Sequence, residues 1–97
     1  MYNIIVSPRA LKEIDESINY YAVFSNKIPL LFVQAIETAF YTLNKNPYYA
    51  IRYKNVRGYK LKNFPYNLYY TINEAKQSVR ILACYHNKRN PQQKPRL

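Results

Sequence analysis

The chain has 97 residues, enough for one small domain with a modest core. It carries 15 Lys and Arg against 5 Asp and Glu, a formal net charge of +10, with one Cys and one Gly. This composition excludes an intramolecular disulfide, a cysteine-rich zinc site and a glycine-rich phosphate loop. No apolar run reaches the roughly 18 residues of a membrane span, and the N-terminus lacks signal-peptide features. We therefore expect a cytoplasmic protein that does not engage a membrane.

The first half of the chain predicts one strand and two helices. Residues 2–6 are a β-rich run, and the Ser-Pro pair at 7–8 provides an N-cap followed by a proline in the first helical turn. Apolar residues then recur at helical spacing to about Phe24. A second apolar stripe begins near Pro29, and Pro47 ends it because the residue before a proline disfavours helix.

The second half predicts a sheet. A loop rich in Tyr and basic residues covers 48–55, and alternating patterns then predict strands at 56–62, 66–72 and 78–86. The last strand is apolar on both faces, so we expect it inside the sheet. The order β-α-α-β-β-β predicts an α+β fold with two helices on one face of a small, mainly antiparallel sheet. We expect residues 1–90 to form this domain and 91–97 a basic tail.

The positive charge is concentrated in the predicted sheet. Residues 1–44 contain three bases and four acids, whereas residues 45–97 contain twelve bases and one acid. This excess favours a polyanionic partner, either nucleic acid or an acidic protein segment. Because only one His and one Cys accompany the five carboxylates, we expect neither a metal site nor a cofactor.

Four residues of the predicted strands form the main candidate site. Lys60 and Lys62 are two apart on one strand, and Arg80 and His86 are six apart on another, so we expect each pair to share a face. If that face lies opposite the helices, it is a basic, Tyr-lined surface that suits a phosphate backbone with bases stacked on aromatic rings. The alternative is a solvated face whose lysines protect the sheet edge.

Three further features have two interpretations each. His86 could act as a general acid or base, or it could be a strand-end histidine bonded to a backbone carbonyl. Cys84 shares its face and suggests a Cys–His nucleophile, but its apolar surroundings favour a buried structural thiol. Aromatic and basic residues of the 48–57 segment could stack on nucleic acid or cover the core edge: Tyr48, Tyr49, Arg52, Tyr53, Lys54 and Arg57.

Several short motifs recur in a fixed order over most of the chain. They are Ser-Pro-Arg-Ala at 7–10, Tyr-Tyr at 20–21, Arg-Gly-Tyr-Lys-Leu at 57–61, Phe-Pro-Tyr-Asn-Leu-Tyr-Tyr at 64–70 and His-Asn-Lys-Arg-Asn-Pro at 86–91. In this order and spacing the sequence resembles the RelE/ParE superfamily of type II toxin–antitoxin toxins. The resemblance implies the β-α-α-β-β-β fold, inhibition of bacterial growth, and a cognate antitoxin as partner.

The superfamily has two branches with different targets. RelE-like members cleave mRNA in the ribosomal A site without a metal, using basic residues that orient the phosphate while a ribose 2′-OH attacks it. ParE-like members poison DNA gyrase and lack that site. The resemblance gives candidate catalytic roles to Lys60, Lys62, His86 and Arg89. The wider candidate set for binding nucleic acid or another target is Arg57, Lys60, Lys62, Arg80, Lys88 and Arg89.

Departures from the RelE pattern favour the ParE-like branch slightly. Asn67 stands where RelE-like enzymes usually carry an arginine, and residues 90–97 contain no Tyr. The His-x-x-Arg ending and the Phe-Pro-Tyr turn are also closer to the ParE side. A RelE-like mRNA endonuclease is the first alternative, and a non-enzymatic nucleic-acid-binding module is the second.

Overall fold

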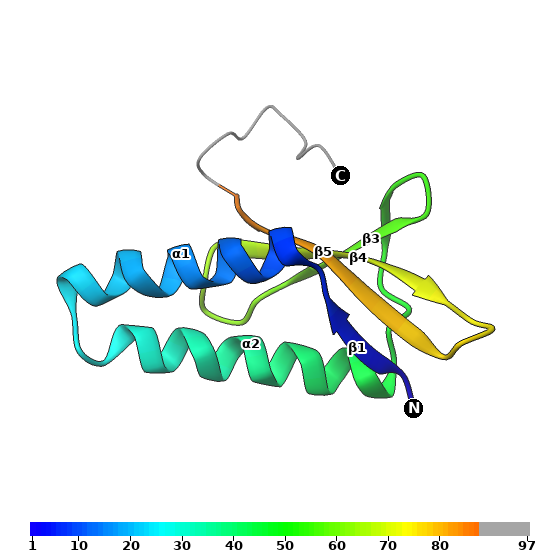
Figure 1. Ribbon diagram of the computed structural model, residues 1–97, viewed down its shortest axis with the longest axis horizontal. Coiled ribbons are helices and arrows are strands. Elements are labelled where there is room, and N and C mark those ends of the chain that lie inside the picture. Colours follow the sequence, from blue (N-terminus) through cyan, green and yellow to red (C-terminus); the bar gives the residue numbers. More distant parts are fainter. Residues whose placement is uncertain (88–97) are drawn as a thin grey trace.

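Two helices pack against one face of a five-stranded sheet in the computed structural model, which describes residues 1–87 (Figure 1). The elements follow in the order β1 (Asn3–Val6), α1 (Pro8–Phe24), α2 (Ile28–Lys45), β2 (Ile51–Tyr53), β3 (Val56–Lys60), β4 (Tyr66–Asn73) and β5 (Ser78–His86). Within the described part, no helix is long and apolar enough to cross a membrane. The expected tail at 91–97 lies outside the described residues.

The strands are ordered β1-β5-β4-β3-β2 across the sheet. The first strand pairs in parallel with β5, and the other neighbours pair antiparallel. This confirms the predicted α+β fold with its mainly antiparallel sheet, and it confirms that β5 is an interior strand. The prediction of a loop over 48–55 was wrong in part, because β2 forms within it as an edge strand.

Local capping explains where the first helix begins. The N–H of Ala10 donates to the hydroxyl of Ser7 at 3.1 Å, and Pro8 occupies the first turn. At the other end, the hydroxyl of Ser25 accepts the N–H groups of Lys27 and Ile28, at 3.0 and 3.1 Å. The short connection that results brings α2 back alongside α1 (Figure 1).

The core lies between the helices and the sheet and contains an aromatic cluster at one end. The ring of Phe32 on α2 lies 5.1 Å from that of Tyr66 on β4 and 5.2 Å from that of Phe64. Tyr21 of α1 completes the cluster, with its ring 5.6 Å from Phe64. These edge-on contacts hold the connection between β3 and β4 against the helices.

A β-bulge divides β5 into two parts. Tyr70 is paired with Ile81 and Tyr69 with Ala83, so Leu82 is the extra residue on β5. A bulge shifts the alternation of side chains by one residue. Two residues on either side of Leu82 that are an even number of positions apart therefore lie on opposite faces of the sheet. The hydroxyl of Ser7 donates to the Leu82 carbonyl at 3.1 Å, so the cap of α1 also holds the bulge.

Candidate functional site

Among residues 1–87, three cations lie on the sheet face opposite the helices, which we call the outer face. Lys60 is paired with Asn67 and Arg80 with Thr71, and these two β4 residues alternate with residues of the core. Lys60 and Arg80 therefore lie on the outer face, where both are exposed. Gly58 also belongs to this face, and the side chain of Arg52 lies across it. A Cβ at Gly58 would be only 2.9 Å from the Arg52 Cγ. We call Arg52, Lys60 and Arg80 the basic stripe.

The strand register sets the length of the basic stripe. Lys60 is paired with Asn67, and Arg80 is paired with Thr71, four residues further along β4. Two strand spacings of about 4.8 Å and four residues of about 3.3 Å each place the Lys60 and Arg80 Cα atoms roughly 16 Å apart. Two cations so far apart suit an extended polyanion better than a single phosphate.

Tyrosines share the outer face with the basic stripe. Tyr69 of β4 and Tyr85 of β5 are partly buried and alternate with residues of the core face. Asn67 is paired with Tyr85 and donates through its side-chain amide to the Asn87 side chain at 2.6 Å. The expected basic, Tyr-lined face is therefore present, with Arg80 and Lys60 on it.

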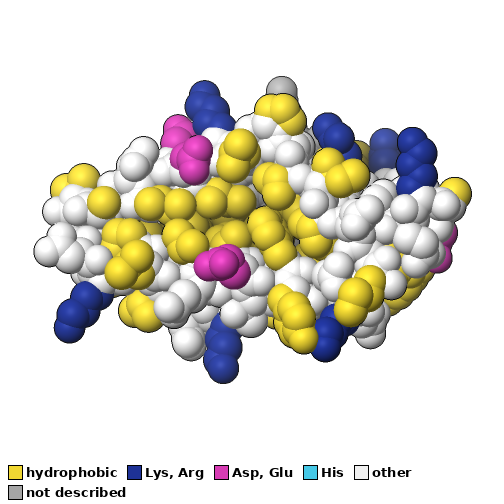
Figure 2. All heavy atoms as spheres, turned by 60° about the horizontal axis from the view of Figure 1, so that its bottom comes forward, with side chains coloured by type: hydrophobic (Ala, Val, Ile, Leu, Met, Phe, Trp, Pro, Cys, Tyr) yellow, Lys and Arg dark blue, Asp and Glu magenta, His cyan; other side chains and the backbone are white. Residues whose placement is uncertain are grey.

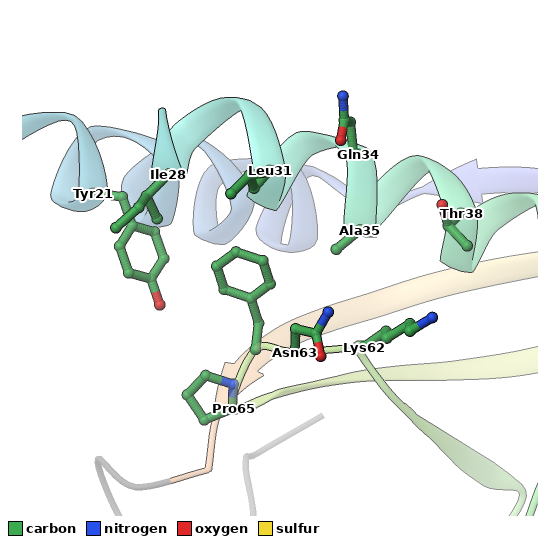
Figure 3. Close-up of a pocket in the computed structure, with 10 residues that line it drawn as sticks. Tyr21, Ile28, Leu31, Gln34, Ala35, Thr38, Lys62, Asn63 and Pro65 are labelled. Carbon is green, nitrogen blue, oxygen red and sulfur yellow. The ribbon is translucent and has the colours of Figure 1, made fainter. Parts of the chain in front are cut away.

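Lys62 is not on this face, contrary to the prediction. The third strand ends at Lys60, and the chain turns through Asn63, whose φ of 67° is in the left-handed region. This turn carries Lys62 to the side of α2, where it lies below Thr38 (Figure 3). The expectation that Lys60 and Lys62 share a strand face was wrong because the strand ends between them.

The predicted position of His86 on the outer face was also wrong. It is paired with Tyr66, whose side chain is in the core, and the two ring centroids are 4.9 Å apart in an edge-on contact. His86 therefore faces α1, whereas Arg80 lies on the outer face. The expectation that the two share a face was wrong because the bulge at Leu82 lies between them.

Arg57 is another of the residues predicted to bind nucleic acid or another target, and the structure describes its position. It lies on the helix side of β3, paired with Tyr70, and donates to the Tyr49 carbonyl at 2.7 Å. Its guanidinium also lies over the Tyr48 ring, 5.1 Å from the centroid. These contacts cover the edge of the core, which is one of the two interpretations of this segment. Residues 88 and 89, Lys88 and Arg89, lie outside the described residues.

The chemistry of Cys84 is that of a structural thiol. The side chain is 3% exposed, and burial, with the nearby carboxylate of Glu13 as a smaller cause, raises its pKa from 9.0 to about 12. The thiol stays protonated at neutral pH and is a poor nucleophile. Within residues 1–87, no group of three or more His, Cys, Asp or Glu could hold a metal ion.

A groove of about 580 Å³ lies between α2 and the turn that joins β3 to β4 (Figure 3). Its residues are Tyr21, Ile28, Leu31, Gln34, Ala35, Thr38, Lys62, Asn63, Phe64 and Pro65. Apolar side chains of α2 point into it, Phe64 lines it from the turn, and Lys62 lies toward one end. This groove was not predicted from the sequence, although Ile28, Leu31 and Ala35 form a second apolar stripe on α2 at helical spacing.

The helical layer carries further exposed apolar side chains. The large ones are Leu11, Tyr20, Val23, Phe24, Ile28, Leu30, Leu31 and Tyr41. Figure 2 shows hydrophobic side chains joined in a band across the surface, with few charged groups interrupting it. Exposed apolar surface of this kind is typical of a protein interface.

A family match places the chain in the RelE/ParE superfamily of toxins, whose fold it shares. More specifically, residues 4–91 match the family described as ParE toxin of type II toxin-antitoxin system, parDE, and the chain belongs to that family. This confirms the predicted class of toxin and favours the ParE-like branch over the RelE-like alternative.

Two solved structures share the fold at low sequence identity. The first is from the chromosomal ParDE system of P. aeruginosa, with a TM-score of 0.76 and 18% identity over 89% of this chain and 96% of that one. The second is from the intact E. coli RelBE toxin–antitoxin complex, with a TM-score of 0.63 and 17% identity over 87% and 94% of the two chains. No curated protein sequence matches the chain.

Proposed function

We propose that this ParE-family chain arrests bacterial growth by acting on DNA gyrase, and that it does not cleave mRNA. The observation that carries the choice is the separation of the candidate catalytic residues. Lys60 is on the outer face, Lys62 is beside α2, and His86 faces α1. Cleavage by a ribose 2′-OH needs its basic groups around one phosphate, and these three side chains do not converge.

The basic stripe is the surface we assign to the target. Its cations extend over roughly 16 Å, a spacing that matches a long acidic surface or a nucleic-acid backbone held by an enzyme. Arg80 lies on β5 and Lys60 on β3, and the Arg52 side chain extends from the edge strand β2 over Gly58 of β3.

Induced expression of the chain and its variants tests this proposal. We expect growth arrest, gyrase-linked DNA breaks and intact mRNA from the wild-type chain. Arg80→Ala and Lys60→Ala should each weaken the arrest, whereas Lys27→Ala should not, because it removes the same charge from the exposed connection between the helices. Codon-specific mRNA cuts with intact DNA would contradict the proposal and support a RelE-like endonuclease.

We also infer that a cognate antitoxin binds the groove beside α2. Apolar side chains of an amphipathic helix would pack on Leu31, Ala35 and Phe64, and a carboxylate of the same helix would pair with Lys62. The support comes from the size and apolar lining of the groove and from Lys62 in its wall, which together suit an acidic, amphipathic segment.

Neighbouring leucines of α2 offer a matched test of this binding site. Leu31 lines the groove and is 53% exposed, whereas Leu30 is 66% exposed and does not line it. Leu31→Glu should weaken antitoxin binding at least tenfold, about 1.4 kcal/mol, and Leu30→Glu should change it much less. Equal binding by both variants, measured by calorimetry with the product of the adjacent gene, would exclude the groove.

A further inference from the structure

A second, smaller cavity of about 100 Å³ lies between α1 and the end of β5. Its wall consists of Glu13, Glu16, Ser17, Tyr66, Cys84, Tyr85 and His86, none of which lines the groove. Two of the five acidic residues of the chain therefore meet in one small space, in a protein of net charge +10. This cavity is locally acidic on an otherwise basic molecule.

The bulge in β5 fixes one of these carboxylates in position. It turns the backbone N–H of Cys84 toward α1, where it donates to Glu13 Oε1 at 3.0 Å. The other oxygen, Oε2, is 3.5 Å from Arg9 Nε, and the hydroxyl of Ser17 donates to the Glu13 carbonyl at 2.9 Å. Glu16 follows three residues later on the same helix and lines the cavity from an exposed position.

An unpaired hydroxyl gives a second and independent indication of a ligand. Tyr66 is 1% exposed, and its hydroxyl is a buried polar atom without a hydrogen-bond partner among the described residues. Buried hydroxyls are rarely left unpaired, because the lost hydration is not replaced. The cavity that Tyr66 lines is several times larger than the roughly 10–15 Å³ that a single water requires, so a functional group fits there.

We propose that this cavity binds the guanidinium group of an arginine side chain presented by a protein partner. The carboxylates of Glu13 and Glu16 can accept its N–H groups, and the Tyr66 hydroxyl can accept another. The edge-on pair of Tyr66 and His86 rings provides an aromatic wall. Guanidinium suits such a wall better than ammonium, because it is planar and less strongly hydrated. The proposal rests on the cavity alone and not on the toxin activity.

Titration of the folded chain with N-acetyl-arginine amide, followed by NMR, tests the proposal. We expect saturable shifts at the backbone amides of Ser17, Cys84 and His86, with a Kd on the order of 1 mM or weaker because the group has few atoms. Glu16→Gln and Tyr66→Phe should each raise that Kd about threefold or more. Asp15→Asn is the matched control, since it removes the same charge from α1 without touching the cavity.

Three results would overturn the proposal. Shifts spread over the whole surface would indicate non-specific binding, and equal weakening by Asp15→Asn and Glu16→Gln would indicate general charge attraction. An equal response to N-acetyl-lysine amide would remove the assignment to guanidinium. The titration uses purified, folded protein without gyrase, so none of these results contradicts the gyrase proposal. Conversely, a chain that had no effect on gyrase would not contradict the cavity proposal.

Discussion

Two buried tyrosines of β4 provide a matched pair of hydroxyl deletions. Tyr66 and Tyr70 are four residues apart on the helix side of the sheet, and both are at most 1% exposed. The Tyr70 hydroxyl donates to the buried Pro47 carbonyl at 2.6 Å, whereas the Tyr66 hydroxyl has no partner within residues 1–87. The two Tyr→Phe changes remove the same atom from two different hydrogen-bonding situations.

The expected effects differ in sign as well as in size. Tyr70→Phe removes one of the two hydrogen bonds that the buried Pro47 carbonyl accepts and leaves the bond from the Tyr49 N–H at 2.9 Å, so it should cost about 1 kcal/mol in the free energy of unfolding. For a domain of this size, that corresponds to a fall in Tm of roughly 4–8 °C. Tyr66→Phe removes an unpaired hydroxyl, so the free energy of unfolding should stay level or rise by up to about 1 kcal/mol.

Urea unfolding followed by far-UV circular dichroism measures both differences. The experiment uses ligand-free protein, because a group bound to the Tyr66 hydroxyl would add its own contribution to stability. Phe24→Ala is a suitable reference for surface truncation, since Phe24 is 69% exposed. Equal losses of stability in Tyr66→Phe and Tyr70→Phe would contradict this prediction, because they would show that both hydroxyls are paired.

Two further predictions concern the start of the first helix and the buried Cys84 thiol and Tyr70 hydroxyl. Ser7→Ala removes both the cap bond to Ala10 and the bond to the Leu82 carbonyl, so it should lower the free energy of unfolding by about 1–2 kcal/mol in the same urea assay. Burial raises the pKa of Cys84 and of Tyr70 to about 12, from 9.0 and 10.0, so the unfolded chain loses these protons first. These two groups should leave the free energy of unfolding unchanged below about pH 9 and lower it between pH 9 and 12. In Cys84→Ala, the part of this decrease that begins near pH 9 should be absent.

Signals between neighbouring residues made the element order predictable. The Ser-Pro pair at 7–8 marked the start of α1, and the apolar stripe ended where α1 ends, at Phe24. The last strand was predicted at 78–86 and is observed at Ser78–His86. These features depend on capping and periodicity, which act over a few residues of sequence.

Features that depend on pairing between distant residues were not predictable. No residue type in the sequence marks the bulge at Leu82, yet the bulge moves His86 from the outer face to the helix side. All three residues of the short edge strand β2 are exposed, so it lacks the alternation that identifies a half-buried strand. Lys62 appeared to continue β3 because its pattern alternates, although the strand ends two residues earlier.

The groove and the basic stripe lie on opposite sides of the sheet, so binding and toxicity should be separable by mutation. Lys62 and Phe64 are in the turn beside α2, whereas Arg80 and Lys60 are on the outer face. We expect Leu31→Glu to remain toxic and to escape the antitoxin, because the stripe is unchanged. Arg80→Ala should weaken the growth arrest but keep its affinity for the antitoxin to within about threefold, because it does not touch the groove. Growth curves with and without antitoxin, combined with binding measurements on folded variants, distinguish these cases. If Arg80→Ala lost both properties while remaining folded, one surface would serve both partners, and the assignment of separate sites would fail.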